Sequence, residues 1–151
     1  GLRFGHLRDL ELWRLVTAQL VHVKQPHMVA DVACLLWVGS AVEQRLGAAR
    51  VFLLWLVGGS LAMLVSTLSV PWPWNLGTGS SQAIMAISGA GLWLMLRGGD
   101  RSMSLRVPVI FSIGLAMAID LVHVYYPKPG HVAGVLLGYA MASLLRRHGR
   151  I

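Results

Sequence analysis

Five long runs of apolar residues restrict what this sequence can fold into. They cover roughly residues 26–42, 51–70, 81–96, 107–125 and 131–145. A helix needs about 20 mainly apolar residues to cross a bilayer, within a range of about 17 to 25. The second and fourth runs meet that length, and the other three are at or just below its lower limit. A short helix still serves if its end stops inside the protein beside a water-filled cavity. The pattern therefore predicts an all-α membrane protein with five transmembrane helices.

The composition agrees with a membrane protein and excludes several other classes. Of the 151 residues, 56% are hydrophobic and 13% are charged, whereas a soluble domain carries about 25% charged residues. The net charge is +7, but no basic stripe alternates with aromatic residues, so nucleic acid is not an expected partner. The single cysteine, Cys34, excludes a disulfide framework. His22 and His27 are five residues apart, which points them to different faces of a helix, so neither a metal nor a cofactor is expected.

The basic residues indicate how the helices are oriented in the membrane. If the helices alternate in direction, eight basic residues fall on one side: Arg45, Arg50, Arg97, Arg101, Arg106, Arg146, Arg147 and Arg150. The two loops between helices on the other side carry only Lys128, and the remaining four basic residues precede the first helix, beside Asp9 and Glu11: Arg3, Arg8, Arg14 and Lys24. By the positive-inside rule the arginine-rich side is cytoplasmic, and Trp72 and Trp74 then lie at the outer interface. We therefore expect one domain over residues 1–151, with an outer loop region (1–25), membrane helices (26–145) and a cytoplasmic tail (146–151).

Polar residues at membrane depth are functional candidates, because burying an ionisable group in lipid costs several kcal/mol. The candidates are His22, His27, Asp31, Ser80, Ser81, Asp120, His123 and His131. All are predicted at or near the outer ends of their helices. This clustering indicates a single water-accessible cavity and not the continuous polar path of a transporter or channel. Each residue alone also has an ordinary structural explanation: a serine bonds back to the preceding turn, and an aspartate such as Asp120 caps a helix or pairs at its end.

The start of the third apolar run has the features of a nucleophile site. Ser81 follows Gly79 and Ser80 at a predicted helix start. Free backbone N–H groups and the positive helix end favour a developing anion there. An oxyanion hole in acyl transfer needs the same groups.

The last apolar run offers a general base for that serine. It begins with His131, and Gly134 and Gly138 follow on the same helix face. Small residues at this spacing let helix backbones approach closely. If the partner is the helix that starts at Ser81, with Gly89 as the matching notch, His131 meets Ser81. A serine with a base in reach is an activated nucleophile.

Three segments together resemble the rhomboid intramembrane serine proteases, of the compact bacterial type. "ELWRLVTAQLVHVKQPHMVADVACLLWVGSAVEQRLG" is similar to the family's stretch from the outer loop through the second membrane helix. "GSSQAIMAISGA" resembles the GxSG motif with its helix, and "GHVAGVLLGYA" the last-helix pattern H-x-x-G-x-x-x-G. The resemblance covers nearly the whole chain. The residues that carry it in the first segment are Trp13, Arg14, His22, His27, Glu43, Arg45 and Gly47.

The resemblance implies a rhomboid-like polytopic helical bundle that cleaves transmembrane helices of substrate proteins in the lipid bilayer. Its active site opens to the extracytoplasmic side of the cell inner (plasma) membrane. Ser81 is the implied nucleophile and His131 the implied base, as a Ser-His dyad without an orienting Asp and without a cofactor. Ser80 is the rival nucleophile, and Gly79-x-Ser81 favours Ser81 by its family spacing. The implied oxyanion hole comprises the Ser81 backbone N–H, His27 and an Asn whose position Asp31 occupies.

Several departures from the family pattern are apparent. An ionised Asp31 cannot donate a hydrogen bond, which leaves three alternatives: it is protonated, it holds His27 as imidazolium, or it has no catalytic part. The cost of a carboxylate beside an oxyanion favours the view that it hinders catalysis. Gln82 replaces the second Gly of GxSG and is expected to crowd the oxyanion hole. Met85 replaces an aromatic that packs on the base, with a less rigid side chain.

Two further expectations follow from the resemblance. The family core has six helices and five are visible in this sequence, so the first is expected to precede Gly1 in a longer chain. The alternative function is a rhomboid-like pseudoprotease that binds membrane helices without cleaving them. Such proteins usually lose the Ser or the His, and the presence of Ser81 and His131 favours the enzyme.

Overall fold

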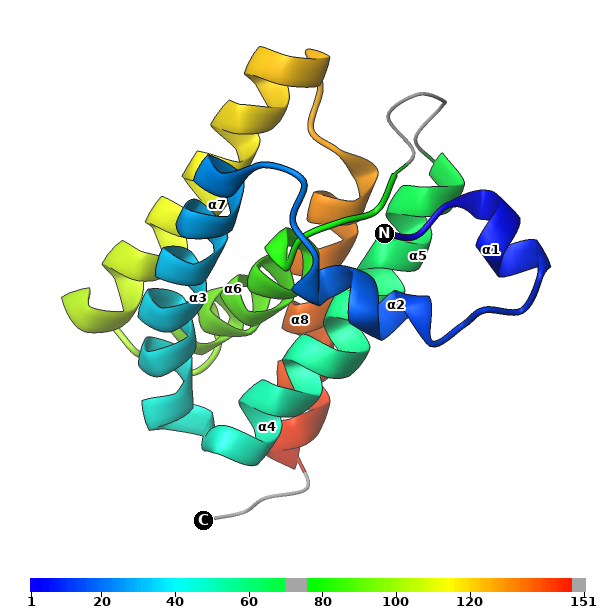
Figure 1. The fold of residues 1–151 in the computed structure, drawn as a ribbon. Helices are drawn as coiled ribbons and strands as arrows, with labels where there is room; N and C mark the ends of the chain where they lie inside the picture. Colours follow the sequence, from blue (N-terminus) through cyan, green and yellow to red (C-terminus); the bar gives the residue numbers. More distant parts are fainter. Residues whose placement is uncertain (70–75, 148–151) are drawn as a thin grey trace.

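Helices make up the regular structure of the part of the chain that the computed structural model describes, residues 1–69 and 76–147 (Figure 1). Their order is α1 (Phe4–Arg8), α2 (Arg14–Thr17), the 3-10 turn η1 (Ala18–Leu20), α3 (Gln25–Leu46), α4 (Ala48–Leu53), the π-helical turn η2 (Leu54–Gly58), α5 (Gly59–Ser69), α6 (Ser81–Leu96), α7 (Met103–Val124) and α8 (Pro129–Arg147). The five predicted helices are confirmed as α3, α4–η2–α5, α6, α7 and α8. The predicted interfacial Trp72 and Trp74, and residues 148–151 of the predicted tail, lie outside the described residues.

Two of the described helices are long and apolar enough to cross a bilayer. They are Ala48–Ser69 and Met103–Val124, with mean hydropathies of 2.1 and 2.0 in their most apolar windows. α6 and α8 are shorter apolar helices, as their sequences predict. The first predicted helix is longer than expected, because α3 continues through polar residues to Leu46 and spans 22 residues. Membrane crossing by all five helices stays a prediction.

Helix α6 lies in the centre of the bundle and contacts α3, α5, α7 and α8 (Figure 1). Every residue from Ser81 to Gly91 is buried. A helix that is apolar on all faces is stable only when it is surrounded, and the small residues of α6 let its neighbours come close. The first residue of α6 is therefore held inside the protein.

A seam of glycines joins α6 to α8. A Cβ atom added at Gly138 would lie 1.7 Å from the carbonyl oxygen of Ala86, and one added at Gly89 would lie 2.0 Å from that of Val135. Only glycine permits backbones to approach this closely. The predicted packing of the α8 glycines on α6, with Gly89 as the matching notch, is confirmed.

The two ends of α3 show where this helix begins and how its last turn is tied to the loop between α6 and α7. Pro26 lies in its first turn, where a missing N–H costs nothing. At its other end Arg45 bonds to Asp100 at 2.8 Å and to Ser102 at 2.7 Å, in the loop between α6 and α7. Hydrogen bonds from Arg45 and then Ser102 hold the pKa of the Asp100 carboxyl well below its usual range.

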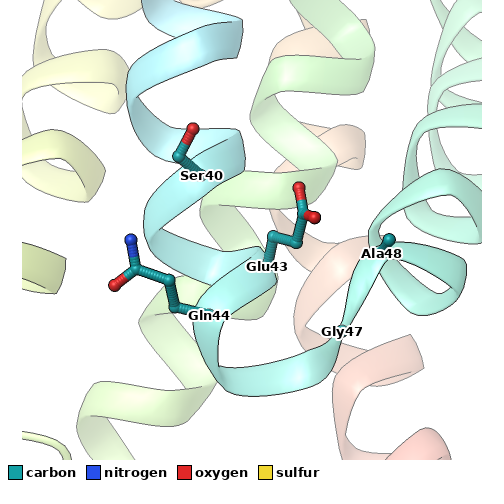
Figure 2. A pocket seen from close by; sticks show the side chains of 5 residues that line it. All are labelled: Ser40, Glu43, Gln44, Gly47 and Ala48. Carbon is teal, nitrogen blue, oxygen red and sulfur yellow. The ribbon is translucent and has the colours of Figure 1, made fainter.

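A surface hollow of about 330 Å³ lies at this same end of α3 (Figure 2). It is lined by Ser40, Glu43, Gln44, Gly47 and Ala48. Its lining includes Glu43 and Gly47, two residues of the family resemblance that lie in the turn after α3, and Gly47 has a φ of +84°. The turn ends α3 and starts α4, so we interpret its residues as structural. The polar candidates lie at the opposite end of α3.

Candidate active site

Ser81 and His131 face each other across the α6–α8 seam. The Oγ atom of Ser81 and the Nε2 atom of His131 are 2.9 Å apart. Ser81 is the first residue of α6, and His131 lies in the first turn of α8. Their exposed fractions are only 9% and 4%. The structure therefore brings the predicted nucleophile and base within hydrogen-bond distance, in a largely buried position.

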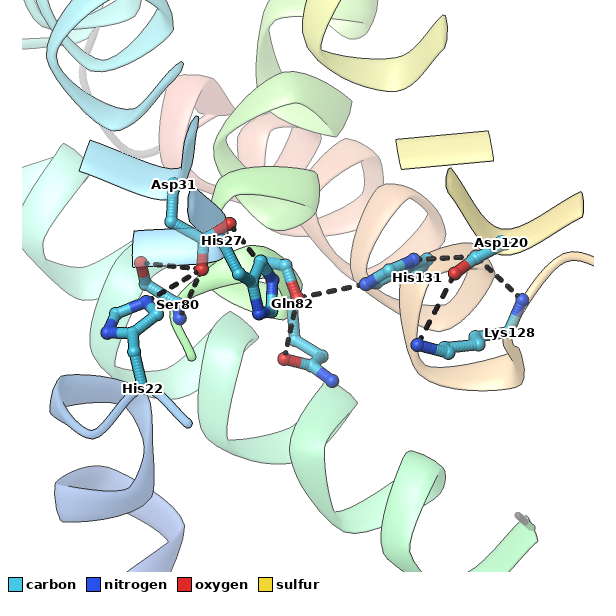
Figure 3. Close-up of polar contacts among 9 residues, drawn as sticks. His22, His27, Asp31, Ser80, Gln82, Asp120, Lys128 and His131 are labelled. Carbon is cyan, nitrogen blue, oxygen red and sulfur yellow. Dashed lines mark hydrogen bonds and ion pairs between the residues drawn. The ribbon is translucent and has the colours of Figure 1, made fainter. Parts of the chain in front are cut away.

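Ser80, the rival serine, faces a different group. Its backbone N–H donates to Oδ2 of Asp31 at 2.9 Å, and its Oγ lies 3.4 Å from the same oxygen. Figure 3 shows Ser80 on the Asp31 side of the site, away from His131. This geometry favours Ser81 over Ser80 as the partner of the histidine.

The second ring nitrogen of His131 has a carboxylate partner. Nδ1 of His131 lies 2.7 Å from Oδ2 of Asp120, which is completely buried near the end of α7. The backbone N–H of Lys128 donates to the same oxygen at 2.9 Å, and the Lys128 Nζ lies 3.6 Å from Oδ1 (Figure 3). The expectation that Asp120 pairs at a helix end is confirmed. The expectation that the base has no acidic partner is wrong.

The sequence contained a signal for this contact that the motif comparison missed. Asp120 is an ionisable residue within an apolar helix, a position that normally requires a partner. Only ten residues separate it from His131, and Tyr125, the residue directly after α7, has a left-handed φ of +64°. This turn brings the start of α8 back against the end of α7.

Asp31 lies at the centre of a second polar cluster. Its Oδ2 is 3.0 Å from Nε2 of His22, and its Oδ1 is 3.5 Å from Nε2 of His27 (Figure 3). Asp31 and His27 thus lie one helical turn apart on the same side of α3, as the alternative in which they pair requires. The expectation that His22 and His27 point to different faces of one helix is wrong, because His22 precedes α3 and both rings reach the same carboxylate.

The Asp31 cluster ties three parts of the chain together. His22 lies before α3, Asp31 is in α3, and Ser80 immediately precedes α6. Gly79, with a φ of +88°, also donates its N–H to the carbonyl of Val21 at 2.8 Å. These contacts fix the start of α6 and hence the position of Ser81. In the part of the chain that is described, no group of three or more His, Cys, Asp or Glu is arranged to hold a metal.

The other polar candidates have distinct surroundings. Gln82 is buried, and its Oε1 lies 3.2 Å from Ser81 Oγ as a second acceptor for that hydroxyl. Met85 is buried against Gly134. His123 is exposed and bonds only to the carbonyl of its own helix at Ile119, 3.0 Å away. It does not join the site, contrary to its prediction as a member of one cluster.

The site meets its surroundings mainly at His27. The His27 side chain is 37% exposed, whereas the side chains of Asp31 and His131 are 8% and 6% exposed. His27 is therefore the most exposed of the three histidines at the site, since the His22 side chain is 9% exposed. The predicted water-accessible cavity stays a prediction.

Comparison with known proteins agrees with the family resemblance seen in the sequence. A family model for the rhomboid domain matches residues 9–148. Rhomboid protease GluP of Bacillus subtilis is 30% identical over 142 residues, which cover 89% of this chain and 26% of the relative. RHOMBOID-like protein 6, mitochondrial, of Arabidopsis thaliana is 26% identical over 138 residues, which cover 89% of this chain and 44% of the relative. RHOMBOID-like protein 7 of Arabidopsis thaliana is 28% identical over 145 residues, which cover 91% of this chain and 44% of the relative. The chain thus spans less than half the length of these relatives.

Proposed function

Because this chain belongs to the rhomboid family, we propose that it is an intramembrane serine endopeptidase. It cleaves peptide bonds in or near the transmembrane helices of other membrane proteins. The observation that carries this proposal is the 2.9 Å approach of Ser81 Oγ to His131 Nε2 at the start of a buried helix. A hydroxyl beside an imidazole is the arrangement that activates serine for acyl transfer.

The proposed reaction has two halves. Ser81 Oγ attacks the peptide carbonyl while its proton passes to Nε2 of His131. The imidazolium then gives that proton to the leaving amine, and the substrate remains esterified to Ser81. Water next attacks the ester while its proton passes to His131, the C–Oγ bond breaks as the imidazolium returns that proton to Ser81 Oγ, and the carboxylic acid product leaves.

The oxyanion of each intermediate needs donors that are already in place. The Ser81 backbone N–H is one, since it lies at the positive N-terminal end of α6 and has no partner within the helix. The proposed second donor is His27, the exposed member of the Asp31 cluster. Asp31 accepts the Ser80 N–H and lies between two histidines. These contacts support a role in holding His27 and the start of α6, in place of direct donation to the oxyanion.

The proposed orientation follows from the charges. Arg45 and Arg101 lie at the ends of helices opposite to Ser81, and the arginine-rich side is cytoplasmic by the positive-inside rule. All five long helices then cross the membrane, and the site opens to the extracytoplasmic face of the inner membrane. Residues 1–25 form the outer region beside the site, where Gly79 bonds to the carbonyls of Ala18 and Val21.

Labelling with a fluorophosphonate probe tests the enzyme against the pseudoprotease. The purified protein in detergent is expected to react, and Ser81→Ala and His131→Ala are expected not to react. Ser80→Ala is the matched control, because it removes the neighbouring hydroxyl and leaves the pair intact. Failure of the folded wild-type protein to label would favour the pseudoprotease, and loss of labelling only in Ser80→Ala would move the nucleophile by one residue.

A further inference from the structure

We propose that Asp120 is a positioning residue for His131, so that the site works as a Ser81–His131–Asp120 triad. This inference rests on the proposed function, because it concerns the same reaction. The basis is the line of contacts Ser81 Oγ to His131 Nε2 at 2.9 Å and His131 Nδ1 to Asp120 Oδ2 at 2.7 Å. The two ring nitrogens of one imidazole thus have a hydroxyl on one side and a carboxylate on the other (Figure 3).

The carboxylate determines which nitrogen of the neutral imidazole carries the proton. An ionised carboxylate only accepts hydrogen bonds, so Nδ1 must be the protonated nitrogen. Nε2 then has a free lone pair directed at Ser81 Oγ, which is the tautomer that can remove the serine proton. When Nε2 takes that proton, the positive imidazolium lies next to the negative carboxylate. Asp120 takes up no proton itself; it orients the ring and stabilises its charged form.

The surroundings of Asp120 keep the carboxylate in place. It is 0% exposed, and a buried carboxylate is strongly unfavourable unless charged or hydrogen-bonding partners compensate it. Lys128 provides a backbone N–H to Oδ2 at 2.9 Å and a charged Nζ 3.6 Å from Oδ1. Lys128 therefore compensates the charge of Asp120 from the side of the loop. Oδ2 of Asp120 is still able to accept the hydrogen bond from Nδ1 of His131.

Two substitutions separate this role from that of a structural ion pair. Asp120→Asn keeps the size but removes the charge, and its amide can donate to Nδ1 and so favour the wrong tautomer. Its kcat/KM is expected to fall by about 10³- to 10⁴-fold, the scale known for loss of an orienting carboxylate. Asp120→Glu retains a carboxylate, and its kcat/KM is expected to exceed that of Asp120→Asn by at least about tenfold if the charge is what matters.

The pH dependence gives a readout that mere misfolding would not change. The charged and titratable groups around His131 are Asp120 from α7, Lys128 from the preceding loop and His27 from α3. The carboxylate pairs with the imidazolium that forms during the reaction, so the pH profile of kcat/KM in Asp120→Asn is expected to differ from that of the wild type. Asp100→Asn is the matched control: it makes the same change at the other end of α6, beside Arg45. Asp100→Asn should leave the pH profile of kcat/KM unchanged.

Nitrogen NMR of the wild-type protein with ¹⁵N-labelled histidine tests the geometry without a substitution in Asp120. The His131 signals are identified by their loss in His131→Gln. A protonated Nδ1 and unprotonated Nε2 in the neutral ring support the inference, and the opposite tautomer overturns it whether or not the protein cleaves a substrate. Unchanged kcat/KM and pH profile in Asp120→Asn, with Ser81→Ala inactive, would also overturn it while leaving the proposed function intact. Residual cleavage by Ser81→Ala would instead contradict the proposed function.

Discussion

Replacing Gly138 by alanine should separate α8 from α6 and thereby pull His131 away from Ser81. The added Cβ would lie 1.7 Å from the Ala86 carbonyl oxygen, whereas ordinary contact begins near 3.4 Å. The obstacle is backbone, so no side chain can rotate away, and the helices must move apart by about 1.7 Å. Because Nε2 and Oγ are now 2.9 Å apart, such a shift breaks their hydrogen bond.

The size of the effect follows from these distances. Overpacking a tight contact costs about 1–3 kcal/mol, and a misplacement of about 1 Å in a reacting group can lower the rate by about 100-fold. We therefore expect a fall of at least about 100-fold in kcat/KM, together with a lower thermal unfolding midpoint. Both are measured in detergent, by cleavage of a transmembrane substrate and by circular dichroism.

Gly114→Ala is the matched control for this experiment. Gly114 lies within α7, and a Cβ there would meet nothing within 4 Å. Exchanging glycine for alanine inside a helix stabilises it by about 0.5–1 kcal/mol, so Gly114→Ala should raise the unfolding midpoint and leave kcat/KM unchanged. Wild-type activity in Gly138→Ala would refute the argument that the glycine seam positions the pair.

Three further predictions follow from the remaining contacts. Asp31→Asn should lower kcat by about 10- to 100-fold, because it removes the carboxylate beside His27 and weakens the charge-assisted hydrogen bond to the Ser80 N–H, a bond of about 1.5–3 kcal/mol; steady-state kinetics between pH 6 and 9 measure it. Asp100 should stabilise the fold at neutral pH and lose this contribution in acid, so melting curves of the wild type and Asp100→Asn should converge as the pH falls below about 4. In a variant without Cys34, single cysteines at Ala48 and Tyr126 should react with membrane-impermeant reagents from opposite sides of the membrane.

Each of these predictions has a clear contrary result. A higher kcat in Asp31→Asn, largest at high pH, would mean that the carboxylate hinders the oxyanion. The direction of the pH effect follows from the lowered pKa of Asp100 in the folded protein. Above the usual titration range of an aspartate the carboxylate is ionised in both the folded and the unfolded protein, and its contribution to stability is complete. This contribution is lost as the pH falls through the pKa of the folded state. A gap between the melting curves that stays constant in acid would exclude this linkage. Reaction of both cysteines from one side would overturn the orientation.

The sequence was sufficient to predict the long helices and the meeting of Ser81 with His131. The helices were predictable because uninterrupted apolar runs leave few other folds open. The meeting was predictable because Gly134 and Gly138 on one helix and Gly89 on the other offered matching small residues for a tight seam. The motif resemblance supplied the order of the segments, and the geometry of the seam agrees with it.

The contacts that were missed depend on turns whose geometry no short motif encodes. Asp120 reaches His131 because Tyr125 adopts a left-handed conformation and reverses the chain. His22 reaches Asp31 because α3 begins only at Gln25 and leaves His22 free to fold back. The first contact joins two different helices, α7 and α8, and the second joins α3 to the segment before it, so the periodicity of a single helix could not place either.

The most direct test of the central claim is proteolysis by the protein reconstituted in lipid vesicles with a substrate that has one transmembrane helix. Cleavage is followed for the wild type, Ser81→Ala, His131→Ala and the double variant, with Ser80→Ala as the control. Because two residues that act as one unit are not additive, both single variants should lose cleavage, and the double variant should be no worse than either. Substantial cleavage by Ser81→Ala, or a double variant whose losses multiply, would contradict a catalytic unit formed by Ser81 and His131.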